Sequence, residues 1–304
     1  MPIAQIRGSV VGMTKHGHSH QGHFDAERVA AALEVEGQLA SGLAAEAITL
    51  CADRFADQGR TVERIVDIGS GPGVDTAQLA ERFPSATVVA ADGSTAMLAR
   101  AEARAKRLGL ADRVETCAVD LDGDLQIAGS CDLAWSAMAI HHAEDEVATL
   151  SRIRELLRPQ GLVCLLERAG PMSVRLADDL GRPGIWERLE EARSAWSAGA
   201  RPTLPGARNA ERYPSMLASA GLDIVASRTL TDTVTAAADP ATRKFLAAQL
   251  RATARNLADV ADAADIEALL AIVDGSREAR WDGVTVTSSR ELFIAQLSGV
   301  SRST

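Results

Sequence analysis

The stretch RIVDIGSGPG (residues 64–73) decides the fold. Its first six residues, 64–69, read as a buried strand that ends in Gly69, and two more glycines follow at 71 and 73. Glycine lets the backbone turn sharply and lets a ligand approach without a Cβ in the way. A helix is predicted from about Val74, with its N-terminus facing that ligand. The stretch therefore predicts a strand, a ligand-binding turn and a helix in succession.

The same alternation continues for a hundred residues. Short apolar runs alternate with amphipathic helices, which is typical of a parallel sheet with helices on both faces. Right-handed crossovers make such a sheet doubly wound. The predicted strands are 64–69, 86–92, 113–120, 131–136 and 161–168, and the predicted helices are 74–83, 95–108 and about 145–158.

Both flanks of this region read as mainly helical. On the N-terminal side a helix is predicted from an N-cap at Asp25 to about residue 59, with bends near Gly37 and Gly42. After Arg168 the alternation stops, and a helix is predicted with Pro214 at its first position. The remaining segments are an irregular helical stretch at 170–200, strands at 222–234 and 284–297, and helices at 239–257 and 264–274.

Composition excludes several partners. The 304 residues carry a net charge of −9, which argues against a nucleic-acid or anionic-membrane partner. No apolar run reaches the ~20 residues of a membrane helix, and no signal peptide is visible. The four cysteines are widely spaced and read as free thiols in a reducing cytoplasm. We expect a globular cytoplasmic protein.

The spacing of the glycines distinguishes two cofactor classes. Dinucleotide folds use G-x-G-x-x-G, which would require glycine where Val74 stands. The motif here is D-x-G-x-G-x-G from Asp67 to Gly73, which resembles the first motif of class I S-adenosylmethionine (SAM)-dependent methyltransferases. The resemblance implies a bacterial small-molecule methyltransferase. It also implies an α/β, Rossmann-like doubly wound sheet of seven mostly parallel strands, with an antiparallel last strand and helical cap insertions.

The cofactor site is expected at the ends of the first four strands. Asp92 ends the second strand, where a carboxylate can accept hydrogen bonds from both ribose hydroxyls. The resemblance implies that Asp120 meets the adenine amino group and that Leu121 packs on the ring. Alternatively, the glycines form a plain turn, Asp92 caps a helix and Asp120 is a solvent-facing acid. The expected SAM-binding residues are Asp67, Gly69, Ser70, Gly71, Gly73, Asp92, Gly93, Ser94, Met97, Asp120, Leu121 and Ser136.

The fourth strand runs into WSAMAIHH (residues 135–142), which is similar to the S-x-x-x-x-H-H stretch of small-molecule methyltransferases. A hydroxyl acceptor loses a proton as it attacks, so a base helps. His142, followed by His141, is the expected catalytic base, with simple packing as the alternative. Met138, Trp186 and Trp196 are expected to bind the acceptor, although the tryptophans could equally be core residues.

The stretch KHGHSHQGH (residues 15–23) is rich in histidine. His16, His18 and His20 would face one side of an extended chain, where they could share a metal. Gly17 and Gly22 loosen the tract, no cysteine accompanies it, and methyl transfer from SAM needs no metal. We therefore expect no metal site, and read the tract as a tail or as the leader to a lid.

These observations predict an enzyme that transfers a methyl group from SAM to a small organic acceptor and leaves S-adenosylhomocysteine. O-methylation is favoured over C- or N-methylation, in secondary or quinone-like metabolism. The alternatives are a catalytically silent SAM-binding protein and a nucleotide-dependent Rossmann oxidoreductase. No nucleic-acid or membrane partner is expected, and the sequence leaves a homodimer open. The expected organisation is a leader and helical lid at 1–60, and a core at 61–304 with cap insertions at about 170–208 and 239–280.

Overall fold

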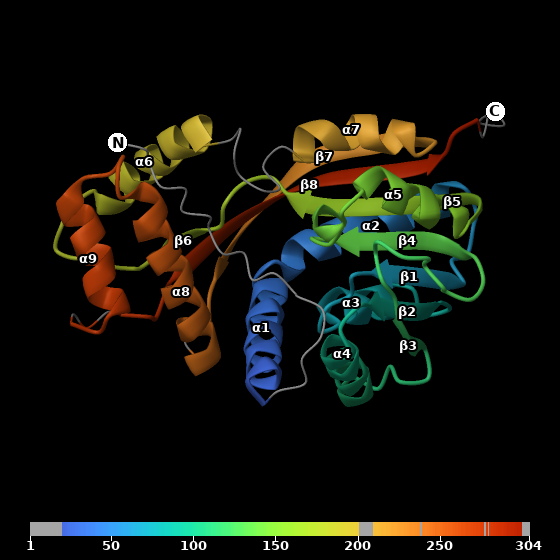
Figure 1. Cartoon of the computed structure of the whole chain (residues 1–304), viewed down its shortest axis with the longest axis horizontal. Coiled ribbons are helices and arrows are strands. Elements are labelled where there is room, and N and C mark those ends of the chain that lie inside the picture. Colours follow the sequence, from blue (N-terminus) through green and yellow to red (C-terminus); the bar gives the residue numbers. More distant parts are fainter. Residues whose placement is uncertain (1–19, 201–208, 238, 277, 279, 300–304) are drawn as a thin grey trace.

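The computed structural model describes residues 20–299 except 201–208, 238, 277 and 279. The chain forms two lobes, a sheet flanked by helices and a smaller helical cap (Figure 1). Two long strands, β7 (Leu222–Thr235) and β8 (Thr285–Leu297), run from the sheet into the cap. Helix α1 (His20–Leu39) stands between the two lobes.

The N-terminal segment is two helices, α1 and α2 (Ser41–Asp57), separated at Ala40. The prediction that Asp25 caps the first helix is wrong, because the helix already begins at His20 and Asp25 lies inside it. The break falls between the two glycines at which bends were expected. Gly37 lets α1 approach Val74, since a Cβ there would lie 3.1 Å from a Val74 methyl.

The parallel sheet follows the predicted alternation. Its strand order is β3-β2-β1-β4-β5, and every neighbouring pair in that series is parallel. The chain leaves β1 toward β2 on one side and returns to β4 on the other, so β1 and β4 flank a topological switch point. The elements are β1 (Arg64–Ile68), α3 (Val74–Arg82), β2 (Thr87–Asp92), α4 (Thr95–Arg107), β3 (Val114–Ala118), β4 (Cys131–Ala137), the short 3-10 helix η1 (Ile140–His142), α5 (Glu146–Glu155) and β5 (Leu157–Arg168).

The C-terminal half adds three antiparallel pairings. β8 runs antiparallel to β5 on one edge and to β7 on the other. β6 (Ser173–Arg175) pairs with residues 285–287 of β8, beyond the stretch that β5 occupies. The sheet thus has eight strands among the described residues rather than the expected seven, with the antiparallel last strand confirmed.

The remaining helices are α6 (Ile185–Ala200), α7 (Asn209–Ser219), α8 (Pro240–Leu257) and α9 (Ala263–Val273). The prediction that Pro214 starts a helix is wrong, because α7 begins five residues earlier. Pro214 lies inside α7 and, lacking an N–H, leaves one carbonyl of the helix without its usual donor. Asp239, in contrast, caps α8 as its position before Pro240 suggests, accepting hydrogen bonds from the N–H groups of Ala241 and Thr242.

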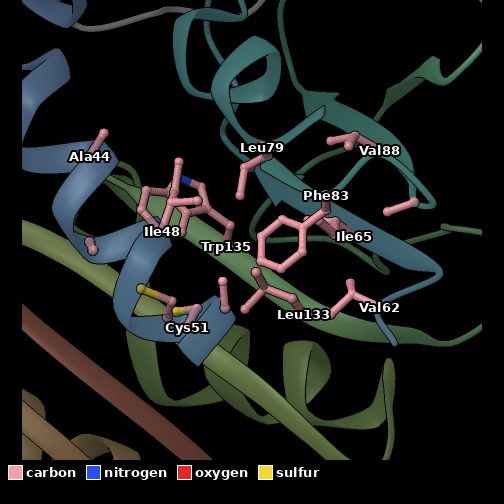
Figure 2. Close-up of a cluster of buried hydrophobic side chains, with 14 of the residues drawn as sticks. Ala44, Ile48, Cys51, Val62, Ile65, Leu79, Phe83, Val88, Leu133 and Trp135 are labelled. Atoms are coloured by element: carbon pink, nitrogen blue, oxygen red, sulfur yellow. The ribbon is translucent and has the colours of Figure 1, made fainter. Parts of the chain in front are cut away.

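One apolar core lies between the sheet and helices α2 and α3. Its centre is Trp135 of β4, which is fully buried among Ile48, Phe83 and Leu133 (Figure 2). A second core occupies the opposite face, under α5 and α7. Aromatic side chains bury the largest apolar areas, so truncating Trp135 to alanine would cost about 3–5 kcal/mol. These cores fix the strand ends relative to one another.

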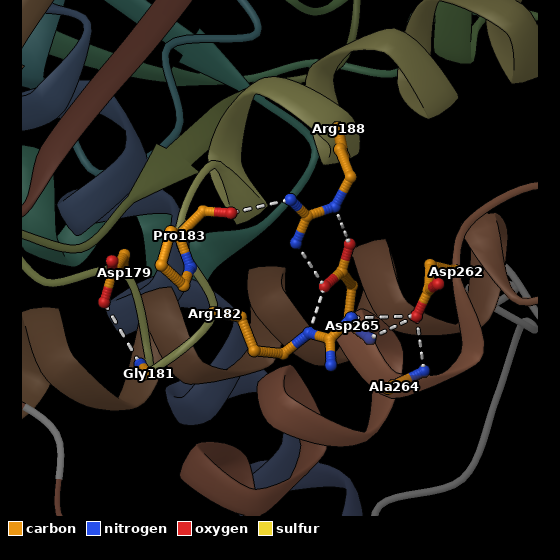
Figure 3. A network of polar contacts seen from close by, with 8 residues as sticks. All are labelled: Asp179, Gly181, Arg182, Pro183, Arg188, Asp262, Ala264 and Asp265. Carbon is orange, nitrogen blue, oxygen red and sulfur yellow. Dashed lines mark hydrogen bonds and ion pairs between the residues drawn. The ribbon is translucent and has the colours of Figure 1, made fainter.

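The cap has an apolar core of its own and a cluster of ion pairs around Asp265. The buried carboxylate of Asp265 on α9 accepts hydrogen bonds from Arg182 and Arg188 (Figure 3). Arg182 also pairs with Asp262 at 3.0 Å. These contacts fasten the loop before α6 and the start of α6 to α9.

Candidate functional site

The glycine loop after β1 has a backbone that only glycine accommodates easily. Gly69 and Gly73 have φ of 71° and 74°. A Cβ on Gly69 would collide with the Cβ of Ala139, and one on Gly73 would lie 2.7 Å from the Cα of Ala101. The loop is therefore packed between the end of β4 and helix α4. It can adopt this shape because Gly69 and Gly73 have no Cβ.

Asp92 connects this loop to the end of β2. One carboxylate oxygen accepts a hydrogen bond from Gly71 N–H at 2.9 Å, and the other accepts one from Ser94 N–H at 2.8 Å. The Ser94 hydroxyl caps α4 by accepting from Met97 N–H at 3.4 Å, so the cap is Ser94 and not Asp92. A carboxylate offers about four acceptor positions, so Asp92 keeps two for a ligand.

Ser70 supplies a test of whether the loop fits a ligand. Its hydroxyl is buried and has no hydrogen-bond partner among the described residues, although the residue stands in the glycine loop itself. Buried polar atoms are nearly always paired, so this atom calls for a partner from outside the chain. Ser70 and the spare acceptor positions of Asp92 together fit the hydroxyls and amine of an adenosyl amino acid such as SAM.

Two of the expected cofactor residues, Asp67 and Ser136, form hydrogen bonds within the protein next to the loop. Asp67 is buried and accepts a hydrogen bond from the Thr76 hydroxyl at 2.6 Å. Burial raises the pKa of Asp67 well above its usual range, and the nearby carboxylate of Asp75 raises it further. Ser136 is also buried and donates to the Ile68 carbonyl at 3.1 Å, across the switch point. Both side chains are engaged with the protein.

The end of β3 lies beside the end of β2. A Cβ on Gly93 would lie 3.2 Å from the Val119 carbonyl, so this glycine permits the close approach. Asp120 is exposed and accepts a hydrogen bond from Asp122 N–H at 3.1 Å. The Leu121 carbonyl accepts a hydrogen bond from the Thr149 hydroxyl at 2.9 Å, so α5 fixes the position of this loop.

The histidines after β4 meet a carboxylate that the sequence reasoning missed. Glu167, near the end of β5, is buried, and one of its oxygens lies 2.7 Å from His141 Nδ1. Its other oxygen accepts a hydrogen bond from Ile140 N–H at 3.1 Å. The carboxylate thereby fixes the orientation of the His141 ring. Only the pairing of β4 with β5 could have indicated it, since Glu167 is the last residue but one of the strand beside β4.

His142 is more exposed than His141, and the two ring centroids are 4.1 Å apart. Partial burial lowers the pKa of His142, and the field of His141 lowers it further against the opposing fields of Glu167 and Asp92. Met138, two residues before η1, has a φ of 57°, which is rare for a residue with a side chain. Backbone strain of this kind concentrates at ligand-binding sites.

A second charged group lies on the other face of the same sheet edge. Arg168 and Arg290 stand opposite each other on β5 and β8, and both bind Glu36 of α1, at 2.7 and 3.4 Å. Asp75, in the first turn of α3, accepts a hydrogen bond from Trp135 Nε1 at 3.2 Å. Burial raises the pKa of Asp75 to about 6. The sequence pattern did not reveal this group.

Helix α1 also contacts the glycine loop through Arg104. Arg104 on α4 donates to the Pro72 carbonyl at 3.2 Å and also pairs with Glu34 of α1. Glu34 binds Arg100 as well, at 3.1 Å. Because Glu36 holds α1 to β5 and β8, the helix is fastened on both sides of the loop that it covers.

Trp186 and Trp196 are not at the strand ends. The structure places both in the apolar core of the cap, where Trp186 donates to the Asp178 carbonyl at 2.8 Å. Trp186 also lines a pocket of about 400 Å³ between β6, α6 and α8, together with Met172 and Leu250. Any contact of Trp186 with an acceptor would be made from this pocket.

The N-terminal histidines lie largely outside the described residues. His16 and His18 do so entirely, and His20 and His23 fall in the first turns of α1, where the backbone alone is described. Within the described part of the chain, no three His, Cys, Asp or Glu side chains gather as metal ligands would.

Known proteins resemble the sheet lobe most clearly. Residues 65–161 match the family model described as "Methyltransferase domain". A trans-aconitate 2-methyltransferase from Deinococcus radiodurans is 39% identical over 107 residues, covering 35% of this chain and 38% of that protein. A malonyl-[acyl-carrier protein] O-methyltransferase from Gallionella capsiferriformans is 31% identical over 116 residues, covering 37% of this chain and 39% of that protein. The matches thus span well under half the length of these relatives.

A solved structure extends the likeness of the fold. A putative methyltransferase from Bacillus halodurans superposes with a TM-score of 0.50 at 14% identity, covering 79% of this chain and 94% of that chain. At this identity the superposition speaks for the fold alone. It agrees with a Rossmann-like parallel sheet ending in an antiparallel strand.

Proposed function

We propose that this protein, whose residues 65–161 form a domain of the class I SAM-dependent methyltransferase family, transfers a methyl group from SAM to a small organic acceptor. The observation that carries the proposal is the loop joined to Asp92, with its unpartnered Ser70 hydroxyl and spare carboxylate positions. SAM, when bound, supplies a methyl group on a sulfonium that is already activated for displacement. The protein then has to hold, orient and shield the two reactants.

The residues of this chain divide that work. Asp92 and Ser70 would hold the ribose and the amino-acid portion of SAM, and Asp120 and Leu121 would flank the adenine. Gly69 and Gly73 keep the backbone shape that lets SAM approach. Helix α1, fastened by Glu34 and Glu36, would exclude water from the donor.

His141 is the base that the geometry supports best. Its Nδ1 faces the Glu167 carboxylate, which leaves Nε2 to accept a proton from an acceptor hydroxyl. The sequence alone favoured His142, but no carboxylate bonded to His142 orients its ring among the hydrogen bonds of the described residues. O-methylation is therefore proposed ahead of N- or C-methylation.

Acidic acceptors are the first class to test. Relatives are named for trans-aconitate and for malonyl-[acyl-carrier protein], and the partly exposed guanidinium group of Arg168 lies at the sheet edge, where it pairs with Glu36. Acceptors from secondary metabolism, including quinone-like ones, form the second class. We place the reaction in the cytoplasm of a bacterium. None of the four cysteines forms a disulfide, and no helix in the described part of the chain is long and apolar enough to cross a bilayer.

Calorimetric titration with SAM, S-adenosylhomocysteine and NAD tests the cofactor. We expect binding of the first two at micromolar concentrations and none of NAD. Binding of NAD without SAM would establish the oxidoreductase alternative instead. SAM binding with no turnover on any acceptor in a labelled-methyl screen would leave a silent SAM-binding protein.

The base is tested by Glu167→Gln, which removes the charge while keeping the shape. We expect kcat to fall about 10–100-fold with SAM affinity kept, because the amide presents the wrong partner to His141 Nδ1. His141→Ala should lower kcat by at least as much, and His142→Ala by less. The matched control is Glu291→Gln, which stands opposite Glu167 on β8 and binds Thr229. Wild-type turnover in both the Glu167 and His141 variants would exclude the dyad.

A further inference from the structure

β7 forms an open edge of the sheet. Over its fourteen residues it pairs with β8, and no other strand of the described chain pairs with it. An uncovered edge offers a row of N–H and C=O groups to another strand, and natural edges are usually protected by brevity, proline or lysine. β7 is long and contains neither residue between Leu222 and Thr235. Residues 227–233, which lie beyond the irregularity between Ile224 and Ala226, are thus open to pairing.

The direction of the free backbone groups follows from the ladder with β8. Ala236 N–H donates to the Val284 carbonyl at 2.8 Å, just beyond the last paired residues. In an antiparallel pair, inward and outward backbone groups alternate along the strand. The outward N–H and C=O groups therefore belong to every second residue, which are Ser227, Thr229, Thr231 and Thr233, all with exposed side chains.

This edge is complementary to itself. When two copies of β7 run antiparallel with Leu230 facing Leu230, Thr229 faces Thr231 and Ser227 faces Thr233. Outward-facing residues then meet outward-facing residues, so every free N–H between 227 and 233 finds a carbonyl. Thr229, Thr231 and Thr233 have a high strand propensity and Ser227 is small, and both properties favour close pairing of the two strands.

Charge fixes the same register. In that alignment Arg228 of each copy faces Asp232 of the other, which makes two opposite-charge pairs. Among the described residues of one copy, Arg228 forms a single, long ion pair, with Glu46 at 3.7 Å, and both side chains are about half exposed. Asp232 lies beside Gly42 in the first turn of α2. Its side chain is on the same face of β7 as that of Arg228.

We propose that β7 pairs edge to edge with β7 of a second copy of this chain, so that two sheets become one continuous sheet across a two-fold axis at Leu230. The partner strand is β7 of a second copy, because in an antiparallel pair Arg228 of each copy faces Asp232 of the other. A two-fold axis uses the same patch on both subunits, as in most soluble homodimers. The pairing leaves the carboxyl edge of the parallel strands, with the candidate site, free on each subunit.

Charge reversal tests the register in the full-length protein by sedimentation equilibrium. We expect the wild type to form a species of twice the 32.0 kDa chain mass. Arg228→Asp and Asp232→Arg should each raise the dissociation constant at least about tenfold, because each puts like charges opposite one another. The double variant should restore the wild-type value. Arg280→Asp, the reversal of a more exposed arginine away from β7, should leave the dissociation constant unchanged.

Three results would overturn the proposal: a monomer up to about 100 μM, single reversals without effect, or a double variant that does not recover. Circular dichroism of each variant shows that it is folded. Disulfide trapping gives a second reading of the register. A mixture of Thr229→Cys and Thr231→Cys proteins should cross-link faster than either alone, since only the mixture places cysteine opposite cysteine. Equal rates would contradict the register.

Discussion

At the scale of single residues, the glycine loop and the carboxylates around it determine what the site can do. Asp92 keeps acceptor positions for a ligand, whereas Asp67 and Ser136 are buried and hydrogen-bond within the protein. Polar side chains at neighbouring strand ends thus have two roles, one toward a ligand and one toward the protein itself.

Gly69→Ala should abolish SAM binding. The added methyl meets Ala139, and alanine also resists the positive φ of 71°. We expect SAM affinity to fall by about 100-fold or more and the melting temperature to drop. Gly109→Ala is the matched control, because Gly109 has a φ of 72° but open space around its Cα. That variant should lose about 1 kcal/mol of stability and keep its SAM affinity. Equal affinity losses in both would refute the steric argument.

Asp75→Asn should stabilise the protein at pH 8. Burial raises the pKa of Asp75 to about 6, above that of the unfolded chain. A carboxyl whose folded pKa is raised contributes stability at low pH that is lost as pH rises from about 4 to 6. Removing the charge should therefore recover up to about 2 kcal/mol at pH 8 and flatten the pH dependence of unfolding. Chemical denaturation at pH 5 and pH 8 measures this, with exposed Asp53→Asn as control.

At the scale of elements, helix α1 is positioned by ion pairs as well as by Val35 and Leu39, which it buries in the core of the cap. Its carboxylates Glu34 and Glu36 reach α4 on one side and β5 and β8 on the other. Ion pairs of this kind weaken with salt and with the loss of one partner. The covering of the glycine loop by α1 is therefore adjustable, and its strength can be changed one charge at a time.

Glu34→Gln should raise the dissociation constant of SAM about 3–10-fold, and more steeply at low salt than at high salt. The loss frees Arg104, which binds the Pro72 carbonyl of the loop. Glu102→Gln is the matched control, since it removes an exposed pair with Lys106 on the same helix as Arg104. Isothermal titration at two salt concentrations measures both. If the two variants bind SAM alike, α1 does not contribute to the cofactor site.

The elements also show how far sequence patterns reach. The five parallel strands and their helices were predictable, because apolar periodicity and the glycine turn act within short windows. β6 was not, since three residues carry no period and pair only because β8 extends beyond β5. The predictions that helices start at Asp25 and at Pro214 were wrong because they relied on single residues. Capping and N1 preferences are weak signals, and both helices extend further toward the N-terminus.

Candidate-site residues were predictable where the motif is local and not where the partner lies on another strand. The glycine loop and Asp92 follow one strand each, and both came from the spacing. Glu167 meets His141 only because β4 and β5 are neighbours, and Glu36 meets Arg290 across 254 residues of sequence. The place of Trp186 in the core of the cap was not predictable, because an aromatic residue carries no sign of which core it enters, and its contact with an acceptor stays a prediction.

At the scale of the whole molecule, the sheet lobe and the cap have separate apolar cores that share β7 and β8. The cap core contains residues of α1, α6, α8 and α9 and the ends of the long strands. Its polar fastening is Asp265 with Arg182 and Arg188 (Figure 3). The two lobes can therefore lose stability independently.

Asp265→Asn should loosen the cap and spare the sheet. Removing a buried carboxylate that binds two arginines costs about 3 kcal/mol. Hydrogen exchange should rise in α9 and around residues 178–188, with β1 and β4 unchanged, and exposed Asp259→Asn should have no effect. The arginines lower the pKa of Asp265, so its contribution is present above about pH 4 and is lost as pH falls through that lowered pKa. Uniform exchange changes in both lobes would contradict the separation.

The pairing of Thr235 with Thr285 has a consequence for how such a protein can change. The 49 residues between them, which include α8 and α9, leave and re-enter the sheet at adjacent points on one hairpin. A segment with neighbouring ends can be exchanged for another of different length without moving the strands that carry it. Grafting a foreign helical pair between these two threonines would rebuild the cover over α6, which a short turn would leave exposed. The hairpin tip is thus a place where the helices of the cap can be exchanged while the glycine loop stays unchanged.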